Sequence, residues 1–138
     1  MKKVLKAYKK TVSIIDETAI QIYESLGSEK KGFLMESNDK ENGRYTFMGV
    51  EPQKLIQSKG NSLVITDING EVEVREGNPF EKLKEYFDEF EVTKEAEELE
   101  FMGGLVGSFG YDFIRYTEKL TDNNEDEIGI ETIQLMLA

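Results

Sequence analysis

The chain has 138 residues, with 17 lysine and arginine residues against 28 aspartate and glutamate residues, giving a formal net charge of -11. This length is typical of a single domain, and the negative charge disfavours nucleic acid and anionic membrane surfaces as partners. The chain has no cysteine and no histidine. Disulfides, thiolate nucleophiles, the common zinc sites and Ser-His-Asp catalysis are therefore excluded.

The N-terminal segment MKKVLKAYKK is basic, but polar residues interrupt the segment that follows it. It therefore lacks the apolar core of a signal peptide, and no later run approaches the roughly 18 apolar residues of a membrane span. We expect a cytoplasmic protein with no membrane segment.

The first predicted helix covers residues 15–26, because its apolar residues recur at spacings of three and four. They are Ile15, Ala19, Ile22 and Leu26. Asp16 is the candidate N-cap, and Gly27 is the candidate C-terminal cap.

Segments rich in β-branched and aromatic residues follow this helix and predict strands. They cover residues 32–37, 44–51, 54–59, 62–66 and 71–75. The last two flank the sequence Asp67-Ile68-Asn69-Gly70. Because Asn-Gly favours positive backbone dihedrals, we predict a tight hairpin with a type I′ turn.

Asn78 and Pro79 supply a cap and a first helical residue for a second predicted helix. Its expected buried face carries Phe80, Leu83, Phe87 and Phe90. Residues 91–100 are mostly charged and either continue this helix or form a solvated linker.

Residues 101–116 are apolar and rich in glycine, residues 121–127 are polar, and residues 128–138 are apolar to the last position. Chain ends normally fray into solvent, so this apolar ending leads us to expect the front of a longer protein. The order of elements predicts an α+β fold, with a mostly antiparallel β-sheet and two main flanking helices. Most connections between strands are too short for parallel crossovers.

The segment GGLVGSFGYD does not have the glycine spacing of a phosphate-binding loop. Its glycines are better explained as positions where another backbone or a ring comes close. Asp112 and Arg115 follow it three residues apart, which predicts a structural ion pair rather than a catalytic one. We assign no catalytic or metal-binding residue to this chain.

Glu36 and Ser37 end one predicted strand, and Arg44 begins the next after a polar turn. An anion, a hydroxyl and a cation placed together would complement a free amino acid, although spacing alone favours an exposed ion pair at a hairpin end. Side chains alternate along a strand, so Leu34 and Glu36 share one face while Met35 and Ser37 share the other. A ligand that contacts both Glu36 and Ser37 requires the strand to bend or end near Ser37.

Three blocks occur in order along the chain: FLMES, then GRYTFMGVEP, and later FMGGLVGSFGYDFIRYTEKL. Together they resemble the N-terminal region of anthranilate synthase component I and of its relative aminodeoxychorismate synthase component I. The resemblance implies the N-terminal regulatory domain, residues 1–138, of a lyase that converts chorismate in tryptophan biosynthesis. It also implies Mg²⁺ and a glutamine amidotransferase subunit as partner for the full-length enzyme, with the chorismate-binding domain lying beyond this chain.

The same resemblance places part of the site for L-tryptophan, the feedback inhibitor, in this region. Carried over by position, the implied ligand-binding residues are Leu34, Met35, Glu36, Ser37 and Arg44. Glu36 is implied as the partner of the ligand ammonium, and Ser37 as part of the pocket wall. Two alternatives stay open: the aminodeoxychorismate enzyme of folate biosynthesis, and a non-catalytic small-molecule binding module.

Overall fold

The computed structural model describes residues 2–6, 8, 10–27, 29–37, 45–92, 103–121 and 129–138. The strands are β1 (Lys3–Leu5), β2 (Gly32–Glu36), β3 (Thr46–Val50), β4 (Lys54–Lys59), β5 (Ser62–Asp67), β6 (Val72–Glu76), β7 (Phe90–Val92), β8 (Leu105–Phe109) and β9 (Ile133–Leu137). The helices are α1 (Ala19–Gly27), α2 (Pro79–Asp88) and the 3₁₀ helix η1 (Tyr111–Tyr116). The predicted α+β class is confirmed.

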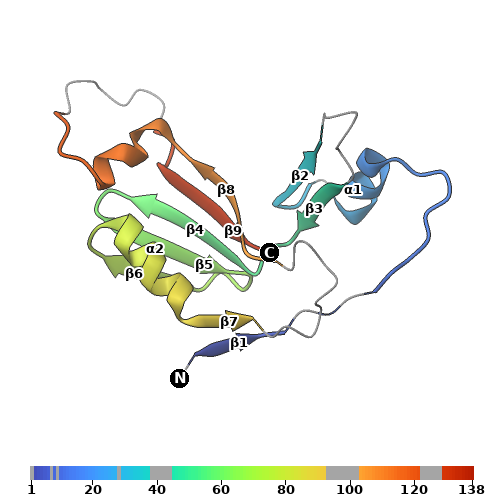
Figure 1. The fold of residues 1–138 in the computed structure, drawn as a ribbon, viewed down its shortest axis with the longest axis horizontal. Coiled ribbons are helices and arrows are strands. Elements are labelled where there is room, and N and C mark those ends of the chain that lie inside the picture. The colour runs from blue at the N-terminus through green and yellow to red at the C-terminus, as the bar shows by residue number, and fades with distance from the viewer. Residues whose placement is uncertain are drawn as a thin grey trace.

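The largest unit is a five-stranded antiparallel sheet in the order β6-β5-β4-β9-β8, with α2 packed on one face (Figure 1). Alternation along the strands turns one set of apolar side chains toward the helix. The buried core cluster is Ile56, Leu63, Ile65, Leu83, Tyr86, Ile133 and Leu135. The sheet and α2 therefore enclose the hydrophobic core.

Helix α2 begins as predicted but buries a different face. The Asn78 side chain accepts hydrogen bonds from the backbone N–H of Phe80 (2.9 Å) and Glu81 (3.4 Å), and Pro79 is the first helical residue. Tyr86 is buried, whereas Phe87 is 53% exposed. The helix ends at Asp88, so Phe90, expected on its face, lies in β7 instead.

Helix α1 starts at Ala19, later than predicted, and Asp16 is not its cap. Thr18 and Gln21 form a reciprocal capping box: the Gln21 N–H donates to Thr18 Oγ1 (3.3 Å), and the Thr18 N–H donates to Gln21 Oε1 (2.8 Å). These bonds satisfy the backbone N–H groups of Thr18 and Gln21, which fixes the start of the helix. Gly27, with φ +109°, ends the helix as predicted.

The β5–β6 hairpin is present, but its turn is not type I′. Of residues 67–70 only Gly70 has a positive φ, +84°, whereas type I′ requires two such residues. The Asp67 carboxylate accepts the N–H groups of Asn69 (2.8 Å) and Glu71 (2.9 Å), which stabilises a wider loop. The bond from Glu71 is the main cause that lowers the pKa of Asp67.

Two predictions about the C-terminal half are confirmed. A Cβ on Gly107 would lie 2.9 Å from the Cα of Leu135, so this glycine allows β8 and β9 to approach closely. Arg115 Nε donates to Asp112 Oδ1 at 2.8 Å, which is the expected ion pair.

A second body consists of α1, β2 and β3, which we call the hairpin unit. Strands β2 and β3 pair antiparallel, and Figure 1 shows the unit set apart from the five-stranded sheet. Strand β1 pairs in parallel with β7 beside the sheet. The predicted polar turn at 38–43, the polar loop at 122–127 and most of the charged segment at 91–100 lie outside the described residues.

Candidate functional site

Strand β2 ends at Glu36, and Ser37 follows it outside the ladder. The last pair of the β2–β3 ladder joins Glu36 to Thr46, and both Glu36 and Ser37 are exposed. The expectation that the strand bends or ends near Ser37 is therefore confirmed.

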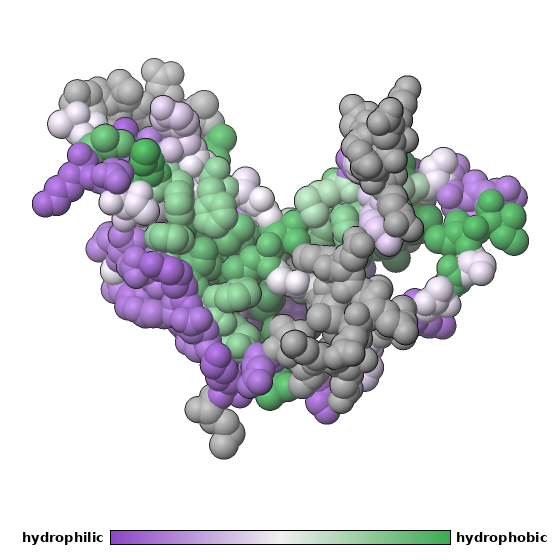
Figure 2. All heavy atoms as spheres, viewed as in Figure 1, coloured by the Kyte–Doolittle hydropathy of each residue, from purple (hydrophilic) through white to green (hydrophobic). Residues whose placement is uncertain are grey.

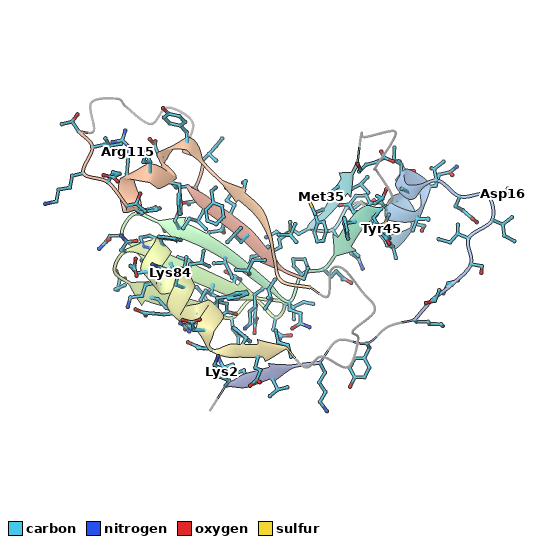
Figure 3. All side chains as sticks on the ribbon, viewed as in Figure 1. Lys2, Asp16, Met35, Tyr45, Lys84 and Arg115 are labelled. Atoms are coloured by element: carbon cyan, nitrogen blue, oxygen red, sulfur yellow. The ribbon has the colours of Figure 1, made fainter. Side chains whose placement is uncertain are left out.

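The predicted ligand-binding residues lie on both faces of the hairpin. A Cβ on Gly32 would lie 2.9 Å from the Tyr23 hydroxyl of α1, so the face of Gly32, Leu34 and Glu36 is turned toward that helix. Met35 is 44% exposed and lies on the side away from α1 (Figure 3). Arg44 lies outside the described residues.

An apolar cleft of about 720 Å³ opens between the hairpin unit and the five-stranded sheet. Figure 2 shows the hollow, with hydrophobic side chains gathered on the side of the sheet. Its apolar lining includes Phe33, Met48 and Val50 of the hairpin unit, Phe87 and Phe90 of α2 and β7, and Leu105 and Leu137 of the sheet. This volume is within the range of pockets that bind small molecules.

Tyr86 also lines the cleft, although only 2% of the residue is exposed. Its ring meets the Phe90 ring edge-on at 5.0 Å between centroids, and the Arg75 guanidinium lies 4.9 Å from the Tyr86 ring centroid. Its hydroxyl has no hydrogen-bond partner within the described part of the chain. Burial raises the pKa of Tyr86, and the charge of Glu73 adds to this effect.

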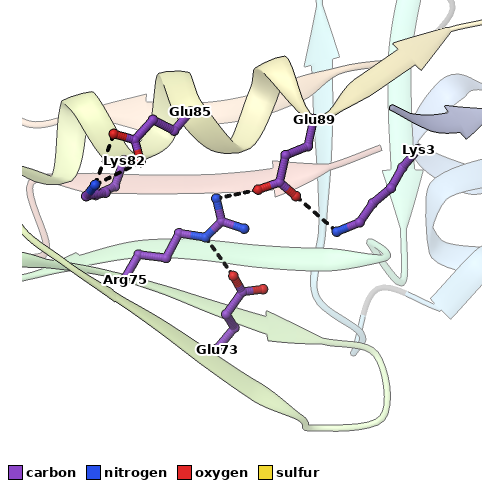
Figure 4. Close-up of polar contacts among 6 residues, drawn as sticks. All are labelled: Lys3, Glu73, Arg75, Lys82, Glu85 and Glu89. Atoms are coloured by element: carbon purple, nitrogen blue, oxygen red, sulfur yellow. Dashed lines mark hydrogen bonds and ion pairs between the residues drawn. The ribbon is translucent and has the colours of Figure 1, made fainter. Parts of the chain in front are cut away.

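A network of ion pairs lies beside Tyr86 and joins three distant segments (Figure 4). The Glu89 carboxylate accepts from Arg75 Nη1 at 2.7 Å and from Lys3 Nζ at 3.0 Å. Arg75 Nε also donates to the Glu73 carboxylate at 2.6 Å. The hydrogen bond from Arg75 is the main cause that lowers the pKa of Glu89, followed by the bond from Lys3. The network thus ties β1 to α2 and β6, which is a structural role.

The sequence gives no sign of the cleft or of this network. Lys3 and Glu89 are 86 residues apart, and only the parallel pairing of β1 with β7 brings them together. In the sequence, the spacing of Phe87 is that of an ordinary core residue of an amphipathic helix, although the structure leaves it exposed. Its place on the cleft depends on where the chain leaves α2.

The described residues contain no cluster of three or more acidic, histidine or cysteine side chains arranged to hold a metal ion. Within the same ranges, no helix is both long and apolar enough to cross a membrane.

Curated relatives of this chain are named anthranilate synthase component 1. The one from Acetivibrio thermocellus is 33% identical over 88% of the chain, and the one from Bacillus caldotenax is 33% identical over 89%. The one from Geobacillus stearothermophilus is 35% identical over 81%. The matched part is 25%, 26% and 22% of these relatives, so the chain spans about a quarter of their length.

No protein-family model matches the chain. The relatives nevertheless confirm the resemblance that the three sequence blocks indicated. The chain is related to a portion of anthranilate synthase component 1.

Proposed function

We propose that this chain forms the N-terminal, regulatory part of an anthranilate synthase component 1 and contributes part of a tryptophan feedback site. Relatives of that name match most of the chain but only about a quarter of their own length. This ratio supports a role as one part of a larger enzyme. The names of these relatives favour anthranilate synthase over the aminodeoxychorismate enzyme.

The observation that carries the proposal is the end of β2. The strand stops at Glu36, so the exposed residues Glu36 and Ser37 lie at the end of the ladder, where strand alternation no longer fixes their side chains on opposite faces. A carboxylate at such a position can accept charge-assisted hydrogen bonds from the ammonium of an amino acid. The other residues of the proposed site are assigned by the family resemblance alone; they are Leu34, Met35 and Arg44.

For the full-length enzyme we propose the conversion of chorismate to anthranilate, with ammonia supplied by a glutamine amidotransferase subunit and with Mg²⁺. We place this chemistry in the portion of the enzyme that this chain does not match. The 138-residue chain alone is expected to show no chorismate turnover and little binding of tryptophan. A cytoplasmic location is part of the same proposal.

The test uses a full-length enzyme that carries this sequence, with Glu36→Ala and Ser37→Phe introduced separately. The first variant removes the partner of the ligand ammonium, and the second fills space beside it. A charge-assisted hydrogen bond contributes about 1.5–3 kcal/mol, so the tryptophan concentration for half-inhibition should rise roughly 10- to 100-fold. Turnover without tryptophan should stay close to that of the unmodified enzyme.

Glu24→Ala is the matched control, because Glu24 is an exposed glutamate on α1 of the same hairpin unit. It should leave inhibition unchanged. Unchanged inhibition and unchanged calorimetric binding in both test variants would show that the feedback assignment is wrong.

A further inference from the structure

A short connection, Glu51 to Gln53, joins the hairpin unit to the five-stranded sheet. On one side, the Glu51 N–H donates to the Lys31 carbonyl (2.9 Å), and the Glu51 carboxylate pairs with Lys30 Nζ (2.9 Å). On the other side, the Gln53 N–H donates to the Leu137 carbonyl at 3.1 Å. Glu51 is thus fixed to the hairpin unit and Gln53 to the sheet.

The Gln53 carbonyl is held as well, because it accepts a hydrogen bond from the Ile68 N–H at 3.2 Å. Pro52 alone separates the two fixed residues. Its ring fixes φ near -65°, which leaves very few torsions to set the direction of the chain between the two bodies.

Glu51 adopts an unfavourable backbone conformation at this point. Its φ is +54°, and among the described residues it is the one non-glycine residue with a positive φ. A residue that precedes proline normally has an extended backbone, so this conformation is doubly unusual. Such conformations persist where the surrounding structure imposes them, and they are concentrated at functional sites and switch regions.

The two bodies otherwise pack mainly within themselves. In the described part of the chain, the extensive contacts of α1 and β2 are with β3, and those of the five-stranded sheet are among its own strands and with α2. The cleft separates the bodies, and Glu51, Pro52 and Gln53 all line it. Residues 10–18, which lead into α1, form no helix or strand.

We infer that Glu51–Pro52 is a strained joint that sets the angle between the hairpin unit and the five-stranded sheet, and with it the width of the cleft. The left-handed Glu51, its pair with Lys30 and the proline ring act together to hold one angle. Removal of any of these three restraints lets the hairpin unit rotate as a rigid body relative to the five-stranded sheet. This inference goes beyond the proposed function, because it does not depend on which ligand binds at β2.

The test measures distances between spin labels by double electron–electron resonance in the 138-residue chain. The chain has no cysteine, so introduced cysteines are its only labelling sites. One pair, Glu24→Cys with Ser108→Cys, spans the cleft from α1 to β8, and a control pair, Glu85→Cys with Ser108→Cys, lies within the sheet and its helix. All three positions are exposed.

Each pair is measured in the parent chain, in Glu51→Gly and in Lys30→Gln. Glycine has no Cβ and takes many more φ and ψ values than glutamate, so Glu51→Gly frees the joint and also removes the ion pair, whereas Lys30→Gln removes only the ion pair. The distance distribution of the spanning pair should broaden in both variants, more in Glu51→Gly, while that of the control pair stays unchanged. An unchanged distance distribution of the spanning pair in Glu51→Gly overturns the inference. Equal broadening in the control pair also overturns it, because the substitution then loosens the whole fold rather than the joint.

Discussion

Ser58→Ala should destabilise the five-stranded sheet through one buried hydrogen bond. Ser58 is 1% exposed, and its Oγ accepts the backbone N–H of Ile133 at 2.9 Å. The β4–β9 ladder stops at the preceding pair, Gln57 with Gln134, so the serine side chain accepts the next strand donor. Alanine would leave that N–H buried without a partner, because Ile133 is 0% exposed.

An unsatisfied buried donor costs about 1–3 kcal/mol. With a urea dependence of about 2 kcal/mol per molar, a loss of about 2 kcal/mol lowers the unfolding midpoint by roughly 1 M. Urea titration followed by circular dichroism measures this shift, and amide hydrogen exchange at Ile133 should accelerate. Ser108→Ala, an exposed serine on β8, is the control and should change stability by less than about 0.5 kcal/mol. A Ser58→Ala midpoint equal to that of the parent chain would refute the role of this bond.

Two further predictions concern stability. Gly107→Ala should destabilise the fold by more than about 2 kcal/mol in the same titration, because the added Cβ would meet the backbone of β9. Gly110→Ala should be tolerated, because its Cβ would come no closer than 3.5 Å to a neighbouring atom. Equal stability of the two alanine variants would contradict this. The lowered pKa of Glu89 means that its pairs with Arg75 and Lys3 stabilise the fold above its ordinary pKa of 4.5, and that this contribution is lost as pH falls through the lower folded value. Glu89→Gln should therefore flatten the loss of stability between about pH 5 and pH 3, and parallel curves for parent and variant would argue against it.

The strands were predictable because their signals are local. All five predicted segments between residues 32 and 75 became strands, with ends that differ by at most two residues. Errors arose where side chains compete for backbone groups. Thr18 and Gln21 moved the start of α1, and the Asp67 carboxylate stabilised a wider loop than Asn69-Gly70 alone predicts.

The candidate site was predictable only in part. The end of β2 near Ser37 followed from alternation along the strand and from the family resemblance. The cleft did not, because Phe33, Phe87 and Leu137 come from distant parts of the chain and meet only in the folded protein. The buried face of α2 was wrong for a related reason: Tyr86 fits the core, while Phe87 is left on the cleft.

The position of β9 has a consequence for synthesis on the ribosome. The last strand along the chain lies inside the sheet, between β4 and β8, rather than at its edge. Until residues 133–137 leave the exit tunnel, β4 exposes an unpaired edge and β8 lacks its only partner within the described sheet. The sheet therefore closes after nearly all of these residues are made, and a nascent chain paused before this point presents an open strand edge to chaperones or to its neighbours.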